Sequence, residues 1–206
     1  MKKIIYNKYD KGAINDLPVV HFEGRIVTVI SSGETRNAID YLLSQQILGV
    51  DTETRPSFKR GHTHDVALLQ VATHSICFLF RLNYIGITPD IIRFLEDTNV
   101  PKVGLSWHDD LLSLGKRAAF NPGYFIDLQD HMGEIGIEDM SLQKLYANLF
   151  GQKIMKREQM SNWEQVILTD KQKLYAATDA WACIMLYEEL TRLKETGNYR
   201  LIINEE

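Results

Sequence analysis

The chain has 206 residues, of which 45% are hydrophobic and 24% are charged, a composition that suits one compact globular domain with a full core. Its net charge of −4 excludes a protein that coats nucleic acid through an overall basic field, so any contact with nucleic acid needs a local site. No segment approaches the about 18 apolar residues of a membrane-spanning helix, and no secretory signal is evident, so we expect no membrane partner. Cys77 and Cys183 lie in apolar segments without a nearby partner, which is typical of buried thiols in a cytoplasmic, reducing compartment.

The first elements are indicated by alternating strand-like and helix-like patterns. Residues 1–22 contain Pro18 and show no clear hydrophobic period, so we expect an irregular N-terminal arm. β-Branched runs bounded by polar turns predict strands, and apolar residues at helical spacing behind a capping residue predict helices. In chain order we expect a strand at 24–30, a helix at 31–43, a strand at 47–54, a loop at 55–65 and a hairpin of strands at 66–73 and 75–82.

The second half of the chain continues the alternation. Thr88 and Pro89 are typical of a helix start, and Ser141 and Gly151 bound another helix on both sides. We expect a helix at 88–98, a strand at 101–106, a helix at 109–120, a strand at 123–132, a helix at 140–151 and a long helix at 168–197. This order predicts an α/β fold in which helices flank a mixed β-sheet.

Several carboxylates stand at positions where charge is costly. Asp51 and Glu53 end an apolar strand, and residues two apart in a strand point to the same face, so two like charges would lie close together. Asp179 lies inside a largely apolar helix, with Tyr175 four residues earlier on the same helical face. Asp109 and Asp110 begin the helix that follows the strand at 101–106.

Each of these features has an ordinary structural explanation when it is taken alone. A carboxylate at a helix start is usually a cap or a partner of the helix dipole, and a Tyr four residues before an Asp usually packs and hydrogen-bonds locally. Together, however, they need a counter-charge, and hard divalent cations such as Mg²⁺ supply it through oxygen ligands. The histidines and cysteines form no zinc motif, and no calcium-loop motif is present, which argues against a structural Ca²⁺ site.

Four segments carry a resemblance to a known family. They are "GVDTE", "GHTHDVALLQVAT", "VGLSWHDDLLSL" and "SNWEQVILTDKQKLYAATDAWACIMLYEEL". They resemble the three successive motifs of the DEDD superfamily of 3′–5′ exonucleases, in the subgroup with a tyrosine in the third motif (DEDDy). The sequence is similar to Werner-type exonuclease domains and, more distantly, to ribonuclease D. The resemblance implies a ribonuclease H-like fold, with a motif-bearing core at about 24–192 inside a single exonuclease domain spanning 1–206.

The resemblance assigns residues to each motif. Asp51 and Glu53 match the first motif, and Tyr175 and Asp179 match the third. Asp110, rather than Asp109, fits the second motif, because Leu114 and the distance to "FIDL" agree better with the family pattern. The histidine subgroup would carry its histidine near the position of Leu174, so that version is excluded.

The implied chemistry is hydrolysis of the phosphodiester at the 3′ end of nucleic acid. Two divalent ions, Mg²⁺ or Mn²⁺, would be held by Asp51, Glu53, Asp110 and Asp179, with Asp51 shared between them. Tyr175 would orient the attacking water, because a phenol with a reference pKa of about 10 is a poor base at neutral pH. The partner is DNA or RNA, with DNA weakly favoured; the alternative is an inactive nucleic-acid-binding or scaffold domain on the same fold.

Substrate contacts follow more loosely from side-chain type and position. Hydroxyls beside the carboxylates, basic residues near the motifs and a tryptophan before the second motif are candidates for contacts with sugars, phosphates and bases. For any one basic residue, an ordinary solvated surface position is an equally good interpretation, and Trp163 is better explained by core packing. The candidates are Thr52, Thr54, Arg60, Trp107, Lys156 and Arg157.

Overall fold

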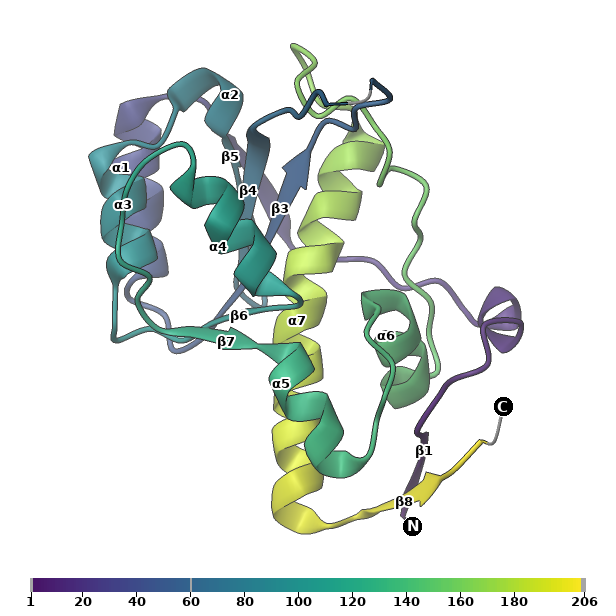
Figure 1. The fold of residues 1–206 in the computed structure, drawn as a ribbon. Helices are drawn as coiled ribbons and strands as arrows, with labels where there is room; N and C mark the ends of the chain where they lie inside the picture. The colour runs from purple at the N-terminus through teal and green to yellow at the C-terminus, as the bar shows by residue number, and fades with distance from the viewer. Residues whose placement is uncertain (1, 60, 205–206) are drawn as a thin grey trace.

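The computed structural model describes residues 2–59 and 61–204, and within them six strands form a central mixed sheet. The strand order is β2-β5-β4-β3-β6-β7 (Figure 1). β4 is antiparallel to both neighbours, β3 and β5, whereas β2 pairs with β5, β3 with β6 and β6 with β7 in parallel. The strands are β2 Arg25–Val29, β3 Leu48–Thr54, β4 Val66–Ala72, β5 Ile76–Arg81, β6 Lys102–Gly104 and β7 Phe125–Asp127.

Helices cover both faces of this sheet. α1, α3 and α4 pack on one face, where Leu48 and Val50 of β3 point, and the long helix α7 crosses the other face (Figure 1). α5 and α6 pack against α7. The helices are α1 Ser32–Leu42, α2 Leu82–Ile85, α3 Pro89–Glu96, α4 Trp107–Gly115, α5 Leu128–Met132, α6 Leu142–Phe150 and α7 Asp170–Thr196, with short 3₁₀ turns at Ala13–Asp16 and Gly133–Ile135.

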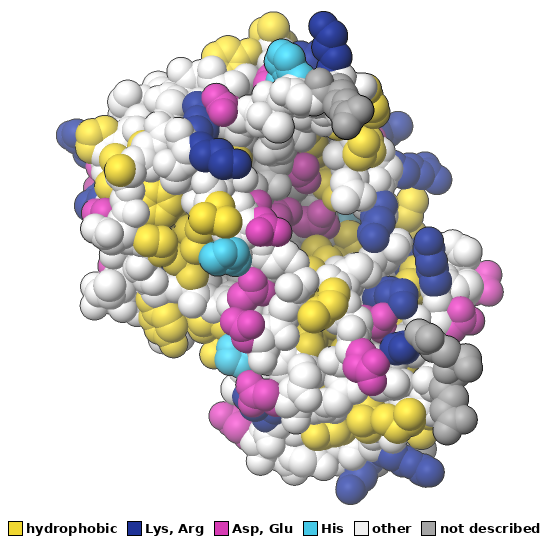
Figure 2. All heavy atoms as spheres, viewed as in Figure 1, with side chains coloured by type: hydrophobic (Ala, Val, Ile, Leu, Met, Phe, Trp, Pro, Cys, Tyr) yellow, Lys and Arg dark blue, Asp and Glu magenta, His cyan; other side chains and the backbone are white. Residues whose placement is uncertain are grey.

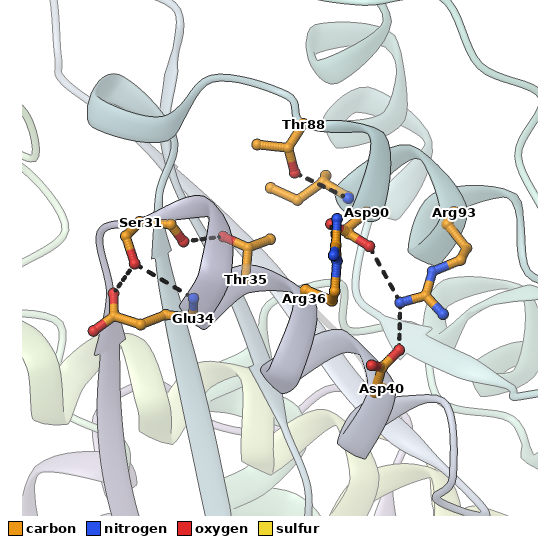
Figure 3. Close-up of polar contacts among 9 residues, drawn as sticks. Ser31, Glu34, Thr35, Arg36, Asp40, Thr88, Asp90 and Arg93 are labelled. Carbon is orange, nitrogen blue, oxygen red and sulfur yellow. Dashed lines mark hydrogen bonds and ion pairs between the residues drawn. The ribbon is translucent and has the colours of Figure 1, made fainter.

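The helix starts follow the capping residues in the sequence. Ser31 and Thr88 accept hydrogen bonds from backbone N–H groups in the first turns of α1 and α3, as Figure 3 shows. Arg93 of α3 donates to Asp40 of α1 at 2.6 Å, and it also donates to Asp90 of its own helix at 3.3 Å. Because these ion pairs are partly exposed to solvent, they contribute at most about 1 kcal/mol each, and the buried side chains beneath them hold the two helices together.

α7 is the element on which the site depends. Thr169 and Gln172 form a reciprocal capping box at its start, and Gly197 ends it in a left-handed conformation. Small residues on its sheet-facing side, Ala176 and Ala180, are fully buried against β4 and β5. The absence of large side chains there lets the helix backbone lie close to the strands.

Most of the expected elements are confirmed, with differences at the ends of the chain and after β7. The N-terminal arm is not wholly irregular, because β1 Lys3–Tyr6 pairs in parallel with β8 Tyr199–Ile202. The strand expected at 123–132 ends at Asp127, whose carboxylate accepts from the N–H of Gln129 and so starts α5. Within residues 2–59 and 61–204, no helix is both long and apolar enough to cross a membrane.

Candidate active site

The first two candidate ligands lie at the end of β3, on the face that α7 covers. Side chains alternate along the strand, so Leu48 and Val50 enter the opposite core while Asp51 and Glu53 point towards α7. Asp51 is half-buried, and only 8% of Glu53 is exposed. Two neighbouring carboxylates are thus partly removed from water at this strand end, where two negative charges would repel each other.

Gly49 allows the third carboxylate to reach the pair. A Cβ atom at Gly49 would lie 1.9 Å from the carbonyl oxygen of Ala180, so the backbone of α7 rests directly on β3 at this point. Asp179, the neighbour of Ala180, is thereby brought to Asp51 and Glu53. One carboxylate oxygen from each of these three residues lies within 4.8 Å of the other two.

Asp110, the candidate carboxylate of the second motif, lies on α4 and is not one of these three clustered carboxylates. Asp127 accepts hydrogen bonds from the N–H groups of Ser106 at 2.9 Å and Trp107 at 2.7 Å, which fixes the sharp turn into α4; Ser106 itself has a φ of 56°. One turn later Asp110 accepts a hydrogen bond from the hydroxyl of Thr52 on β3. Asp110 is half-buried, whereas Asp109 is exposed.

Burial raises the pKa of every carboxylate in this group, and repulsion by the neighbouring carboxylates adds to the effect at Asp51 and Glu53. Burial, followed by the charges of Asp179 and Asp110, raises the pKa of Asp51 well above its usual range. Burial and the neighbouring carboxylates raise the pKa of Glu53 to about 10. The pKa of Asp179 rises to about 7 and that of Asp110 to about 6, mainly through burial. The four groups therefore cannot all be ionised near neutral pH without added positive charge.

The donor set fits a divalent cation. All the donors are carboxylate oxygens, which suit hard ions such as Mg²⁺ and Mn²⁺ rather than zinc. Moreover, Oδ1 of Asp179 is buried and has no hydrogen-bond partner among the described residues. A bound cation would give that oxygen a partner and relieve the repulsion.

Tyr175 lies beside the carboxylates, one helical turn before Asp179. Its phenol hydrogen-bonds the Asp179 carboxylate, and burial together with the surrounding negative charge raises its pKa well above the usual value. The ring of Trp163 packs against it, with ring centroids 6.0 Å apart, and Trp163 is fully buried. Tyr175 is thus held in place from two sides and remains protonated.

A cavity of about 270 Å³ opens over the carboxylates. Figure 2 shows acidic side chains gathered in a hollow near the middle of this face, with basic side chains to the right of it. The cavity is lined by Asp51, Thr52, Glu53, Leu105, Ser141, Leu142, Gln143, Ile154, Lys156, Gln159, Tyr175, Asp179 and Cys183.

The residues expected to contact the substrate lie in different surroundings in the structure. Lys156 lines the cavity over the carboxylates, whereas Arg157 lines a second, largely apolar cavity of about 240 Å³, and Tyr175 borders both cavities. Thr52 is engaged with Asp110, and Thr54 is half-buried at the end of β3. Lys156 and Arg157 therefore face two different spaces.

Of the two remaining residues expected to contact the substrate, one is buried in the core and the other is not among the described residues. Trp107 is 1% exposed, and its ring stacks on Phe125 with centroids 5.5 Å apart. Its ring is part of the core and is not available to stack on a base, contrary to the prediction, because the turn held by Asp127 directs it inward. Arg60 lies outside the described residues.

Glu164 is a contact that the sequence reasoning missed. Its carboxylate lies 3.1 Å from the guanidinium of Arg55 and 2.9 Å from Nδ1 of His64. Arg55 is the first residue after β3, and His64 lies two residues before β4, so Glu164 connects both end regions of the intervening loop to the segment that carries Trp163. The position of Glu164 directly after Trp163 is the one feature of the sequence that could have drawn attention to it, but the sequence does not indicate that its partners are Arg55 and His64.

Comparison with known proteins agrees with this site. Residues 26–195 match the 3′–5′ exonuclease family, and the chain belongs to that family. The six-stranded mixed sheet with flanking helices is accordingly a ribonuclease H-like fold.

Three proteins illustrate the similarity of this chain to known exonucleases and ribonucleases. The chain is 30% identical over 193 residues to the bifunctional 3′–5′ exonuclease/ATP-dependent helicase WRN of Mus musculus, a match that covers 89% of this chain and 14% of that protein. It is 29% identical over 148 residues to ribonuclease D of Xanthomonas oryzae, covering 70% and 40% respectively. The crystal structure of the Aedes aegypti Nibbler exonuclease domain is similar in fold, with a TM-score of 0.74 at 23% identity and coverage of 86% and 92%. The chain therefore spans only a small part of the mouse relative.

Proposed function

We propose that this exonuclease hydrolyses the terminal phosphodiester at a 3′ end with two divalent ions, Mg²⁺ or Mn²⁺, held by Asp51, Glu53, Asp110 and Asp179. The observation that carries the proposal is the set of three carboxylates whose oxygens lie within 4.8 Å of one another. Asp110 adds a fourth carboxylate through its contact with Thr52. Asp51, on the middle of the three elements, is the ligand shared by the two ions.

The residues around the ions have separate tasks. When bound, the two ions supply an activated water and stabilise the leaving 3′ oxygen. Tyr175 keeps its proton, because its pKa is raised, so it acts as a hydrogen-bond donor that orients water and not as a general base. Trp163 holds the Tyr175 ring against α7. The position of Tyr175 beside Asp179 supports membership of the tyrosine subgroup.

The proposed substrate is a nucleic-acid strand with a free 3′ end, and DNA is weakly favoured over RNA. Similarity to the Werner-type domain supports DNA, whereas similarity to ribonuclease D keeps RNA as the alternative. Lys156, in the cavity wall, and Arg157, beside it, would meet phosphates, and Thr54 would contact the terminal nucleotide. We propose residues 1–206 as one exonuclease domain with its motif-bearing core at about 24–192.

The test is degradation of 5′-labelled single-stranded DNA, recessed duplex and RNA with Mg²⁺ or Mn²⁺. We expect a ladder of products shortened from the 3′ end, abolished by EDTA and by Asp51→Ala. Cleavage that survives both treatments would contradict the metal mechanism. Binding of the substrate without cleavage would instead favour the alternative, an inactive binding domain.

A further inference from the structure

Gln70, on β4, is a buried polar residue that neither the fold nor the site described above explains. Its side chain is fully buried, and neither its amide nitrogen nor its amide oxygen has a hydrogen-bond partner among the described residues. Its neighbours on the same face of the strand, Leu68 and Ala72, are apolar and belong to the core against α7. A leucine or methionine at position 70 would match that environment better.

Asn148 shows what a structural amide looks like in the same molecule. It is 6% exposed, and it donates to the carbonyl oxygen of Tyr6 at 2.7 Å and accepts from the N–H of Tyr6 at 2.9 Å. Both ends of that amide are satisfied, so it stabilises the attachment of β1. Gln70 has no such role, because a buried amide without partners destabilises the folded chain.

The register of the sheet places Gln70 beside the candidate metal site. β3 and β4 are antiparallel, and Gln70 lies directly opposite Asp51. Directly opposite residues in such a pair point to the same face, with Cβ atoms about 4.5–5.5 Å apart. The free amide and the carboxylate thus share one face of the sheet. On the same face, Oδ1 of Asp179 also lacks a partner.

We propose that Gln70 is a positioning residue for Asp51: its amide N–H donates to the Asp51 carboxylate when a divalent cation is bound, and so fixes the orientation of that ligand. The inference rests on the proposed metal site. Hydrogen bonds from groups behind the ligands commonly orient them in this way. The amide is retained for the loaded site although it destabilises the metal-free chain.

This role predicts opposite effects of Gln70→Leu on stability and on metal binding. Without metal, the variant should be at least as stable as the natural chain, because an unpartnered amide has been replaced by an apolar side chain of similar size. With metal, it should need about 10–100-fold more Mn²⁺ for half-maximal activity, the usual effect of losing a group that orients a ligand. The rise in Tm caused by Mn²⁺ alone should shrink, which is a readout independent of activity.

Asn148→Leu is the matched control, since it replaces a buried amide by the same residue. It should lower the Tm of the metal-free protein, because it leaves the backbone groups of Tyr6 unpartnered, and should leave the Mn²⁺ requirement unchanged. Gln70→Met repeats the test with an unbranched side chain in case leucine does not fit.

The proposal is overturned if both Gln70 variants are less stable than the natural chain without metal, or if either binds Mn²⁺ with unaltered strength. These outcomes differ from a failure of the proposed function. If the natural chain lacks nuclease activity but Mn²⁺ still raises its Tm, the Gln70 variants still test the role of Gln70. If Mn²⁺ does not raise the Tm of the natural chain, the metal site and the role of Gln70 are both contradicted.

Discussion

At the scale of single residues, the sequence located the clustered carboxylates because their surroundings are unusual. Asp51 and Glu53 follow an apolar strand, and Asp179 interrupts an apolar helix, and the structure places these three together. Trp107 was misjudged, because its direction depends on a turn that Asp127 holds from a strand about 20 residues away. A contact of that kind leaves no local pattern in the sequence.

The neighbouring carboxylates Asp109 and Asp110 provide a test at this scale. Asp110→Asn should lower kcat by at least about 10–100-fold, because it removes a candidate metal ligand. Loss of a residue that only orients a metal ligand already has an effect of that size. Asp109→Asn should leave kcat nearly unchanged, since Asp109 is exposed. Steady-state rates on a 5′-labelled oligonucleotide measure both. A larger loss in Asp109→Asn would mean that the second motif has been assigned to the wrong residue.

At the scale of elements, the site depends on how closely α7 approaches β3. The sequence predicted both elements but not their contact, because the need for glycine at position 49 arises only when the carbonyl group of Ala180 lies against it. The same contact sets the separation between Asp51 and Asp179. A change in the packing of α7 on β3 would therefore also change the distance between these two carboxylates.

Gly49→Ala tests this contact. The added methyl group would overlap the carbonyl oxygen of Ala180, so α7 must shift, and we expect a loss of about 1–3 kcal/mol in the free energy of unfolding, together with loss of activity. Urea unfolding measures the first quantity. Gly33→Ala is the control, since its Cβ would meet nothing within 4 Å and α1 should be unchanged or slightly stabilised. Equal effects of the two substitutions would contradict this account.

The contact of Glu164 with Arg55 and His64 makes a second prediction at the scale of elements. Glu164→Ala should free the loop at 55–65 and loosen the segment that carries Trp163, so kcat should fall while the Tm changes by only a few degrees. Near-ultraviolet circular dichroism of the tryptophans reports the loosening. Glu188→Ala removes a similar exposed contact, with His74, away from the site and should change neither quantity. Matching losses of kcat in both variants would refute a specific role for Glu164.

At the scale of the whole molecule, the chain order predicted an α/β fold with a mixed sheet, and the structure confirms it. The pairing of β1 with β8 was not predicted, because the two strands lie at opposite ends of the chain and each is only four residues long. Short strands that pair across such a distance depend on the finished core of α6 and α7 beneath them. Local hydrophobic periodicity carries no information about that support.

The charge cluster also governs the stability of the whole molecule. Without metal, the folded chain holds protons on Glu53, Asp179 and Asp110, whose pKa values are about 10, 7 and 6, whereas the unfolded chain releases them near pH 4. Because the folded state then binds more protons, stability must fall as pH rises from about 5 to 8. Added Mg²⁺ should weaken this dependence, because it replaces protons in the folded state, and should stabilise the protein more at high pH. Urea unfolding at several pH values, with EDTA or with Mg²⁺, measures both effects. Metal-free stability that rises over this range would show that the carboxylates are ionised in the folded chain without a cation.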